Sequence, residues 1–155
     1  MKTHNNHKIG LISSRGGHLY QLYLLKDFWG TYPRFWITEK GEDSDFLLKN
    51  EKIYYGFFPV TRNIIHAVQN FLYAISVLYK ERPTILLSCG AGIAPPVYIA
   101  GMLFGCTLIF LDSYTFYLYP SLSARIISLF STVTLTQHKS IAKTHQKFTY
   151  WGKLI

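Results

Sequence analysis

The sequence predicts an α/β fold, a Rossmann-like doubly wound parallel sheet. Short apolar runs alternate along the chain with longer segments of helical spacing, which is the order of strands and helices in a parallel sheet. Several runs are apolar throughout, as in strands that are covered on both faces. Turns rich in glycine and serine follow two of them. Since 155 residues are one domain's length, we expect residues 1–155 to form a single domain.

The first half of the chain is expected to contain three strands, over residues 8–13, 34–38 and 52–58. A tight turn follows the first strand, and a helix is expected over 18–29. The segment 39–50 carries four acidic residues, so we expect a surface loop there with at most one helical turn.

The longest expected helix covers residues 61–80. Its polar residues recur at three- and four-residue spacing and form one stripe: His66, Gln69, Asn70, Tyr73 and Lys80. Apolar residues form the opposite stripe: Ile64, Val68, Phe71, Ile75 and Leu78. This pattern is typical of an amphipathic helix, so we expect the apolar stripe to pack on the sheet.

An uncharged run covers residues 83–111 and exceeds the length that a bilayer span needs. Pro95 and Pro96 would break a continuous helix within it. We therefore expect two buried strands, over 84–88 and 107–111, with a helix over 96–104 between them. The remaining elements are a helix over 121–130, a strand over 132–136, a short basic helix and an apolar tail.

Composition excludes several classes of protein. Apolar residues make up 49% of the chain and charged residues 15%, which excludes intrinsic disorder. The two cysteines, Cys89 and Cys106, lack the spacing of a zinc site or a disulfide scaffold, so no metal is expected. The polar N-terminus lacks the apolar segment of a signal peptide. The net charge is +8, but the bases are scattered, so we expect no nucleic-acid partner.

Three loops follow expected strands and stand out by their composition. They are loop one (13–18), loop two (88–96) and loop three (112–120). Parallel sheets bind ligands at the carboxyl ends of their strands, so these loops form the candidate site.

Loop one reads Ser13-Ser14-Arg15-Gly16-Gly17-His18. Small residues let backbone amides approach an anion at the start of the following helix. His18 would then lie near the bound group, as a base or as a donor to an oxyanion. A tight turn with an exposed histidine is the other interpretation.

Loops two and three each leave two interpretations open. Gly90, Ala91 and Gly92 suit either a second phosphate site or close packing of a helix on the sheet. Asp112 is the one acidic residue after position 83, and four aromatic residues follow it in loop three. Tyrosine rings suit a sugar, a lipid interface or a partner surface. The alternative is a loop that folds back onto the core.

Four segments of the sequence together resemble one family across nearly the whole chain. They are SSRGGHLYQLYLLKDFWGTYPRFWIT, ERPTILLSCGAGIAPPVYIAGMLFGCTLIFLDS, YPSLSARI and TYWGKLI. With its SSxGGH and GAGIAxP motifs in this order, the chain resembles the membrane-associated subunit of split glycosyltransferases. In eukaryotes that subunit anchors the second N-acetylglucosaminyltransferase of the dolichol pathway. Bacterial relatives serve capsule and exopolysaccharide assembly.

The resemblance implies the N-terminal half of a GT-B glycosyltransferase, which binds a polyprenyl-pyrophosphate-linked sugar acceptor. It implies a separate catalytic subunit that binds the UDP-sugar, no cofactor on this chain, and peripheral attachment to the cytoplasmic face of the cell membrane. Phosphate contacts are then expected from Ser14, Gly16, Gly17, Gly90, Ala91 and Gly92. The base would be His18 or Asp112. Relatives usually carry Glu at the position of Asp112 and a basic residue at that of Phe116.

The resemblance also implies where this chain meets its catalytic partner. The docking residues would be those of the tail: Tyr150, Trp151, Gly152, Leu154 and Ile155. Membrane contact is expected from exposed aromatic residues of the first helix and of loop three. These are Tyr20, Tyr23, Trp29, Tyr114, Phe116 and Tyr117.

A nicotinamide-dependent oxidoreductase is the main alternative of another class. Glu39 falls at the end of the second expected strand, where an acid that binds ribose would lie. However, loop one lacks the GxGxxG spacing of dinucleotide-binding turns.

Overall fold

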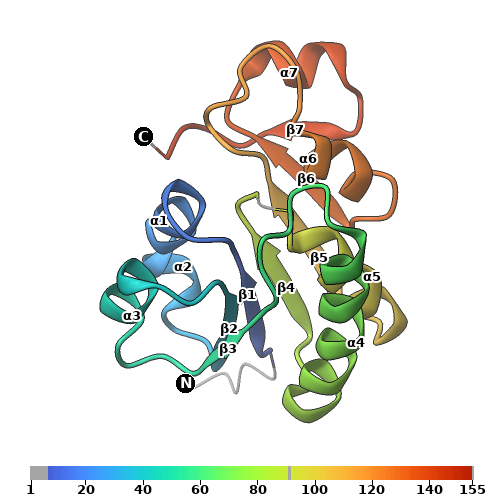
Figure 1. The fold of residues 1–155 in the computed structure, drawn as a ribbon. Coiled ribbons are helices and arrows are strands. Elements are labelled where there is room, and N and C mark those ends of the chain that lie inside the picture. Colours follow the sequence, from blue (N-terminus) through green and yellow to red (C-terminus); the bar gives the residue numbers. More distant parts are fainter. Residues whose placement is uncertain (1–6, 91, 155) are drawn as a thin grey trace.

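The computed structural model describes residues 7–90 and 92–154, which form a parallel sheet with helices on both faces (Figure 1). The seven strands lie in the order β3-β2-β1-β4-β5-β6-β7. Their bounds are β1 (Ile9–Ile12), β2 (Arg34–Thr38), β3 (Ile53–Tyr55), β4 (Ile85–Ser88), β5 (Thr107–Leu111), β6 (Val133–Thr136) and β7 (Phe148–Tyr150). The predicted fold class is confirmed, because the order reverses beside β1 as in doubly wound sheets.

The six strands expected from the sequence are present, and β7 is an additional one. It pairs with β6, with Thr149 opposite Leu135, in a segment that we expected to be tail. The third strand is shorter than expected, since β3 ends at Tyr55 rather than at residue 58. The uncharged run 83–111 contains β4, a helix and β5, as predicted. Among the described residues, no helix has the length and hydropathy to cross a membrane.

Two groups of helices cover opposite faces of the sheet (Figure 1). One face carries α1 (Gly17–Tyr23), α2 (Lys26–Trp29) and α3 (Glu42–Leu47), with Leu22 and Trp29 in its core. The other carries α4 (Ile64–Glu81), α5 (Ala94–Leu103), α6 (Leu122–Ile127) and α7 (Lys139–Thr144), with Val77 and Val97 in its core. The helix expected over 18–29 is thus divided into α1 and α2, and α3 lies in the expected loop.

The buried face of α4 matches the predicted apolar stripe only in part. Three of its five residues (Phe71, Ile75 and Leu78) are buried or pack against the core, as expected. Ile64 and Val68, which we expected to pack on the sheet, are 81% and 54% exposed. Asn70, which we expected in solvent, is 1% exposed. Its side chain bonds both backbone groups of Phe57, accepting from the amide at 2.8 Å and donating to the carbonyl at 2.9 Å. These two bonds fix the segment after β3 and satisfy the polar groups of Asn70 on the buried side of the helix.

An apolar groove of about 320 Å³ lies against β4, β5 and β6 on the face that carries α1 and α2. Leu87, Ile109, Leu111, Val133 and Leu135 form its floor, and Leu25, Phe28 and Trp151 form its walls. We call it the apolar groove below.

Candidate functional site

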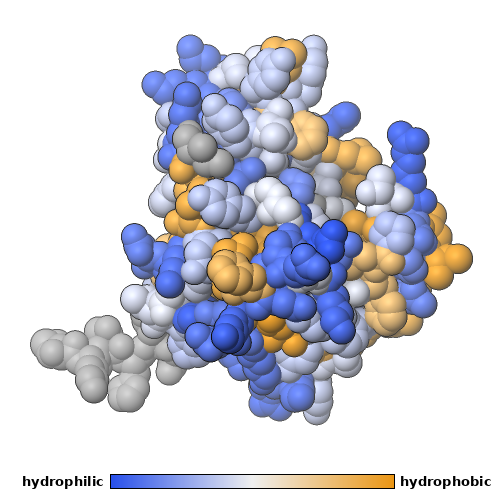
Figure 2. Space-filling model, turned by 60° about the vertical axis from the view of Figure 1, so that its left-hand side comes forward, coloured by the Kyte–Doolittle hydropathy of each residue, from blue (hydrophilic) through white to orange (hydrophobic). Residues whose placement is uncertain are grey.

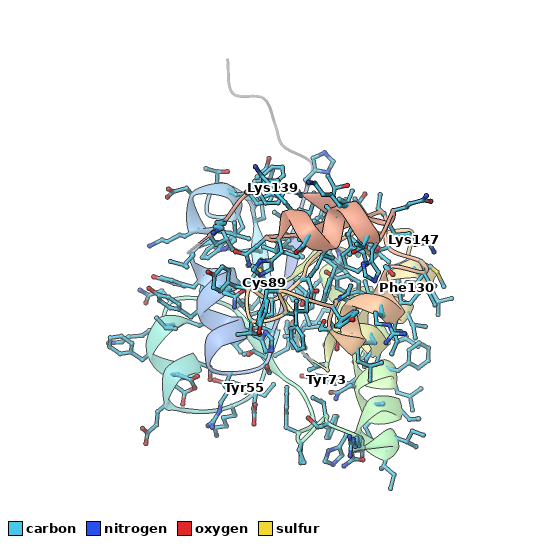
Figure 3. All side chains as sticks on the ribbon, turned by 90° about the horizontal axis from the view of Figure 1, so that it is seen from above. Tyr55, Tyr73, Cys89, Phe130, Lys139 and Lys147 are labelled. Atoms are coloured by element: carbon cyan, nitrogen blue, oxygen red, sulfur yellow. The ribbon has the colours of Figure 1, made fainter. Side chains whose placement is uncertain are left out.

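Loops one and two meet because β1 and β4 are neighbours. Ile12 at the end of β1 lies opposite Ser88 at the end of β4, so both loops leave the sheet at its carboxyl edge. His18 Nδ1 lies 3.0 Å from the carbonyl oxygen of Cys89. Figure 3 views this edge from above, with Cys89 near the middle. A carbonyl oxygen only accepts, so Nδ1 carries the proton and, in the neutral ring, Nε2 keeps a free lone pair.

Gly90 makes this contact between His18 and loop two possible. Its φ of 96° lies in the left-handed region that side chains other than glycine avoid. A Cβ there would also lie 2.5 Å from His18 Nδ1. Both the conformation and the close approach therefore require glycine at position 90.

A cavity of about 280 Å³ opens beside this contact. Ser14 and His18 of loop one and Gly92 of loop two line it, together with Glu39 and the segment 58–61. His66 Nδ1 donates to the carbonyl of Pro59 at 2.7 Å and fixes that segment. Residues 52–58 were expected to form a strand, so the contribution of Phe58 to this wall was not expected. Gly56, which directly follows β3 and weakens a strand, was the signal that the strand ends earlier.

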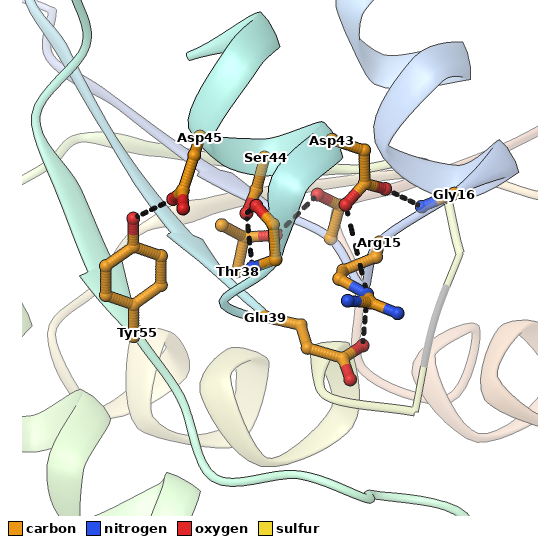
Figure 4. Close-up of polar contacts among 10 residues, drawn as sticks. Arg15, Gly16, Thr38, Glu39, Asp43, Ser44, Asp45 and Tyr55 are labelled. Atoms are coloured by element: carbon orange, nitrogen blue, oxygen red, sulfur yellow. Dashed lines mark hydrogen bonds and ion pairs between the residues drawn. The ribbon is translucent and has the colours of Figure 1, made fainter. Parts of the chain in front are cut away.

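The amide of Gly16 in loop one already has a hydrogen-bond partner within the chain. The amide of Gly16 donates to Asp43 Oδ2 at 2.7 Å (Figure 4). Arg15 Nε lies 3.9 Å from both Glu39 Oε2 and Asp43 Oδ1. The Asp43 carboxylate therefore accepts from the amide that we expected to donate to a phosphate. Gly17 is exposed at the start of α1.

The remaining predicted phosphate contacts are only partly described. Gly92 is exposed and lines the cavity. A Cβ added at Gly92 would lie 2.9 Å from Val60 Cγ2. Ala91 lies outside the described residues. Of the expected phosphate contacts, the structure thus brings Ser14 and Gly92 to one cavity with His18.

Asp112 is 1% exposed and serves the fold around α6. Its carboxylate accepts from Ser121 Oγ at 2.7 Å, from the Ser121 amide at 3.2 Å and from the Ser113 amide at 3.0 Å. Burial raises the pKa of Asp112, and the bonds from Ser121 and Ser113 oppose that rise. Ser121 in turn caps α6 by accepting from the Ala124 amide at 3.1 Å. The expected catalytic role does not fit a carboxylate that is enclosed in this way.

Loop three is tied to α1 and to the end of β6 through Gln21. The side chain of Gln21 donates to Ser113 Oγ at 3.3 Å and accepts from the Tyr114 amide at 3.2 Å. Gln137 Nε2 donates to the same Gln21 oxygen at 3.2 Å. His138 Nε2 donates to the carbonyl of Tyr114 at 2.7 Å, and the two rings lie 5.2 Å apart. Loop three is therefore anchored at Ser113 and Tyr114, and nearer its tip the Tyr117 carbonyl accepts from Ser140 Oγ at 3.1 Å.

The aromatic residues expected at the membrane differ in how far they are exposed. Tyr20, Phe116 and Tyr117 are exposed, and Tyr23 and Tyr114 are half-buried. The prediction is wrong for Trp29, which is 1% exposed. Its Nε1 donates to the Leu22 carbonyl at 2.8 Å, and the Arg34 guanidinium lies 5.0 Å from its ring. Trp29 is a core residue because its ring fills the space between α2 and the sheet.

The tail follows β7 along the carboxyl end of the sheet. The amide of Trp151 donates to the Thr136 carbonyl at 3.1 Å, and that of Leu154 to Gln137 Oε1 at 2.9 Å. Tyr150 and Trp151 are exposed, and Gly152 and Leu154 are half-buried. Ile155 lies outside the described residues. Because Trp151 forms a wall of the apolar groove, this part of the predicted docking segment borders an open apolar surface.

The two cysteines are buried and do not line the cavity beside His18. Cys89 and Cys106 are free and buried, and burial raises the pKa of the Cys89 thiol, which keeps it protonated. Within residues 7–90 and 92–154 no group of three histidine, cysteine or acidic residues is placed to hold a metal.

Solved structures of sugar-nucleotide enzymes share this fold. MurG of Acinetobacter baumannii matches with a TM-score of 0.74 at 14% identity, over 87% of this chain and 43% of that one. UDP-GlcNAc 2-epimerase of Methanocaldococcus jannaschii gives 0.70 at 13%, over 92% and 45%. The lipopolysaccharide outer core galactosyltransferase WaaB gives 0.64 at 12%, over 92% and 44%. No protein-family model and no curated protein matches the sequence.

The chain spans less than half the length of these structures. It has the fold of one half of a GT-B-type structure. At these identities the likeness establishes the fold alone.

Proposed function

We propose that this chain is the acceptor-binding half of a two-chain, nucleotide-sugar-dependent glycosyltransferase of polysaccharide biosynthesis. The observation that carries the proposal is the cavity at the carboxyl edge, where His18 meets loop two. In sheets of this type that edge binds ligands. A GT-B enzyme needs two such halves, and this chain matches less than half of each similar structure.

In the proposed reaction, a polyprenyl-pyrophosphate-linked sugar enters from this chain and a UDP-sugar from its partner. Nε2 of His18 removes the proton of the acceptor hydroxyl. The oxygen then bonds to the anomeric carbon while the bond from that carbon to the UDP oxygen breaks, and UDP leaves with the electron pair. The Cys89 carbonyl holds Nδ1 and keeps Nε2 free for this proton. Base catalysis of this kind contributes about 10²–10⁴-fold.

The acceptor's pyrophosphate would bind at the amides of loops one and two. For the Gly16 amide to take part, the Asp43 carboxylate must leave it, since one N–H donates one strong bond. Arg15 is half-exposed beside the same carboxylates. Its guanidinium is the cation that would pair with a phosphate bound in their place.

The catalytic partner would dock at the apolar groove. Its floor of five aliphatic side chains lies on strands β4 to β6, and Trp151 of the predicted docking segment forms one wall. A helix with an apolar face fits such a sheet surface, since helices pack on sheets in this way throughout α/β folds.

Co-expression with the product of the neighbouring gene, followed by a transfer assay, tests the proposal. The complex is expected to transfer sugar from a UDP-sugar to lipid acceptors extracted from membranes, and the chain alone to transfer none. Transfer by the purified chain alone contradicts a split enzyme. A thermal shift with NAD, together with none from a prenyl pyrophosphate, favours instead the oxidoreductase for which Glu39 was noted.

A further inference from the structure

Glu39 is the acidic side chain of the cavity beside His18. It directly follows β2 and lines the cavity of about 280 Å³ together with His18. Among the described residues its one polar partner is Arg15, whose Nε lies 3.9 Å from Oε2 (Figure 4). This separation is beyond hydrogen-bond distance, so both oxygens of Glu39 keep their capacity to accept hydrogen bonds.

The neighbouring carboxylate of Asp43 is used differently. It accepts from the Gly16 amide at 2.7 Å and lies 3.9 Å from Arg15 Nε. Figure 4 shows Arg15 between the two carboxylates. Asp43 lines a second, larger cavity of about 650 Å³, whereas Glu39 lines both cavities. Of the two acids, Glu39 is therefore the one that borders the cavity of His18.

The surface next to Glu39 is hydrophilic. α3 begins three residues after Glu39 and carries Glu42, Asp43 and Asp45 in its first turn. Figure 2 brings the side of α3 forward and shows hydrophilic residues over much of its lower half. Since like charges repel, the part of an acceptor that lies against Glu39 is its neutral, hydroxyl-bearing sugar and not its pyrophosphate.

The wall of the smaller cavity combines a polar part with an apolar part. Ser14, His18 and Glu39 supply polar groups, and the segment 58–60 supplies apolar ones. Binding sites for small molecules typically have such an apolar lining with a few placed polar groups. A volume of about 280 Å³ is at the lower end for such sites, so the cavity fits a single sugar ring better than a dinucleotide.

We infer that Glu39 binds hydroxyl groups of the acceptor sugar and thereby selects which sugar is accepted. The inference rests on the proposed function, because it names a residue that recognises the acceptor in the same cavity. A carboxylate accepts from two neighbouring hydroxyls at once, one on each oxygen, and a hydrogen bond to a charged group is about twice as strong as a neutral one. A ring held in this way lies in the cavity that His18 also lines, where a further hydroxyl meets Nε2.

The place of Glu39 in the fold supports this chemistry. In dinucleotide-binding sheets an acid at the corresponding place accepts from the hydroxyls of a ribose. Loop one lacks the GxGxxG turn that would hold a dinucleotide. What remains of that arrangement is a carboxylate at the end of β2 that can bind the hydroxyls of another sugar.

Binding of synthetic acceptors to the full chain tests the inference. The probes are a short-chain prenyl pyrophosphate without a sugar and the same lipid linked to glucose, galactose or N-acetylglucosamine, measured by isothermal titration calorimetry. At least one sugar should tighten binding to the wild type by about ten-fold or more. Glu39→Ala should abolish this gain but bind the bare lipid at least as tightly as wild type, since a negative charge is lost. Glu39→Gln keeps one acceptor oxygen and should retain part of the gain.

Two further measurements exclude indirect effects. The matched control is Glu42→Ala, because Glu42 is exposed and lines the larger cavity only. It removes the same charge and should keep the gain from the sugar within two-fold, and circular dichroism melting establishes that each variant is folded. Deoxy forms of the best-bound sugar identify the hydroxyl that Glu39 holds. Its removal should weaken binding to the wild type about ten-fold or more, and binding to Glu39→Ala less than two-fold.

Other outcomes overturn the inference, and they differ from failure of the proposed function. A folded Glu39→Ala variant that keeps the gain from the sugar overturns it, as does a wild type that gains from none of the sugars. Equal weakening of bare and sugar-linked lipids would mean that Glu39 only orders loop one through Arg15. A hundred-fold loss of turnover in the partner complex at unchanged KM for the acceptor would make Glu39 the base instead. If the wild type binds neither the bare nor the sugar-linked lipids, the proposed function fails as well.

Discussion

His18 Nδ1 and the carbonyl oxygen of Cys89 are joined at 3.0 Å, which ties the start of α1 to the end of β4. The bond settles the tautomer of His18, because the carbonyl accepts only. It also brings His18 of loop one into contact with loop two. Changes at His18 and at Gly90 should therefore act on the same property.

Replacing His18 separates a catalytic role from a structural one. His18→Ala should lower turnover of the partner complex by about 10²-fold or more if Nε2 is the base. His18→Asn keeps a donor near the Nδ1 position but has no base, so it should be equally impaired. Steady-state transfer kinetics check both variants. If His18→Asn retains turnover, the histidine only ties the loops together.

Gly90→Ala should remove activity through the position of His18. The added Cβ would lie 2.5 Å from Nδ1 at a φ of 96°, so the ring must move. We expect a loss of about ten-fold or more in turnover and of about 1–3 kcal/mol in stability. Gly105→Ala is the matched control, because Gly105 has a φ of 68° with no heavy atom near the added Cβ. It should cost similar stability at unchanged turnover, measured by urea unfolding and the transfer assay.

Asp112→Asn tests whether the enclosed carboxylate is a base or a structural acceptor. The change removes one oxygen from an arrangement that accepts three bonds, so stability should fall by about 1–2 kcal/mol. Turnover per folded molecule should stay within about three-fold. Ser121→Ala, which removes the cap of α6, should show the same pattern. A hundred-fold loss of turnover at wild-type stability would restore Asp112 as the base.

Glu81 makes folding sensitive to acid. Its carboxylate is buried, which by itself raises its pKa, but bonds from Lys52, Lys8 and Tyr54 outweigh burial and lower the pKa to about 2. A pKa lowered on folding stabilises the protein above the unfolded value and is lost as pH falls towards the folded one. About 3 kcal/mol should therefore disappear between about pH 5 and pH 2.

Urea unfolding at several pH values checks this window. Glu81→Gln should be less stable by about 3 kcal/mol at pH 7 and should lose most of the pH dependence in this range. Glu51→Gln is the control, since Glu51 pairs with Arg34 in a less buried place, and a smaller effect is expected. An identical acid transition in wild type and Glu81→Gln would contradict the assignment.

The sequence predicted the strands well because their apolar runs are set by burial on both faces of the sheet. It failed where a single polar contact decides the packing. Asn70 belongs to the polar stripe of α4 but is buried, because its amide pairs with the backbone of Phe57, which hydropathy alone cannot anticipate. Likewise, the enclosure of Asp112 by Ser121, nine residues later, and the contribution of residues 58–61 to the cavity both depend on how loops fold, which the local pattern does not show.

A charge in the apolar groove should block the partner and leave the fold of the chain intact. Val133 lies on the floor of the groove and is 37% exposed, so Val133→Glu keeps its carboxylate in water while the chain is alone. Docking of a partner helix would bury that charge unpaired, at a cost of several kcal/mol. Co-purification with the partner should therefore fall at least fifty-fold, while circular dichroism melting shows a folded chain. The matched control is Leu129→Glu, because Leu129 is 71% exposed just after α6, across the sheet, and co-purification should stay unchanged. A folded Val133→Glu chain that still captures its partner would place the docking surface elsewhere.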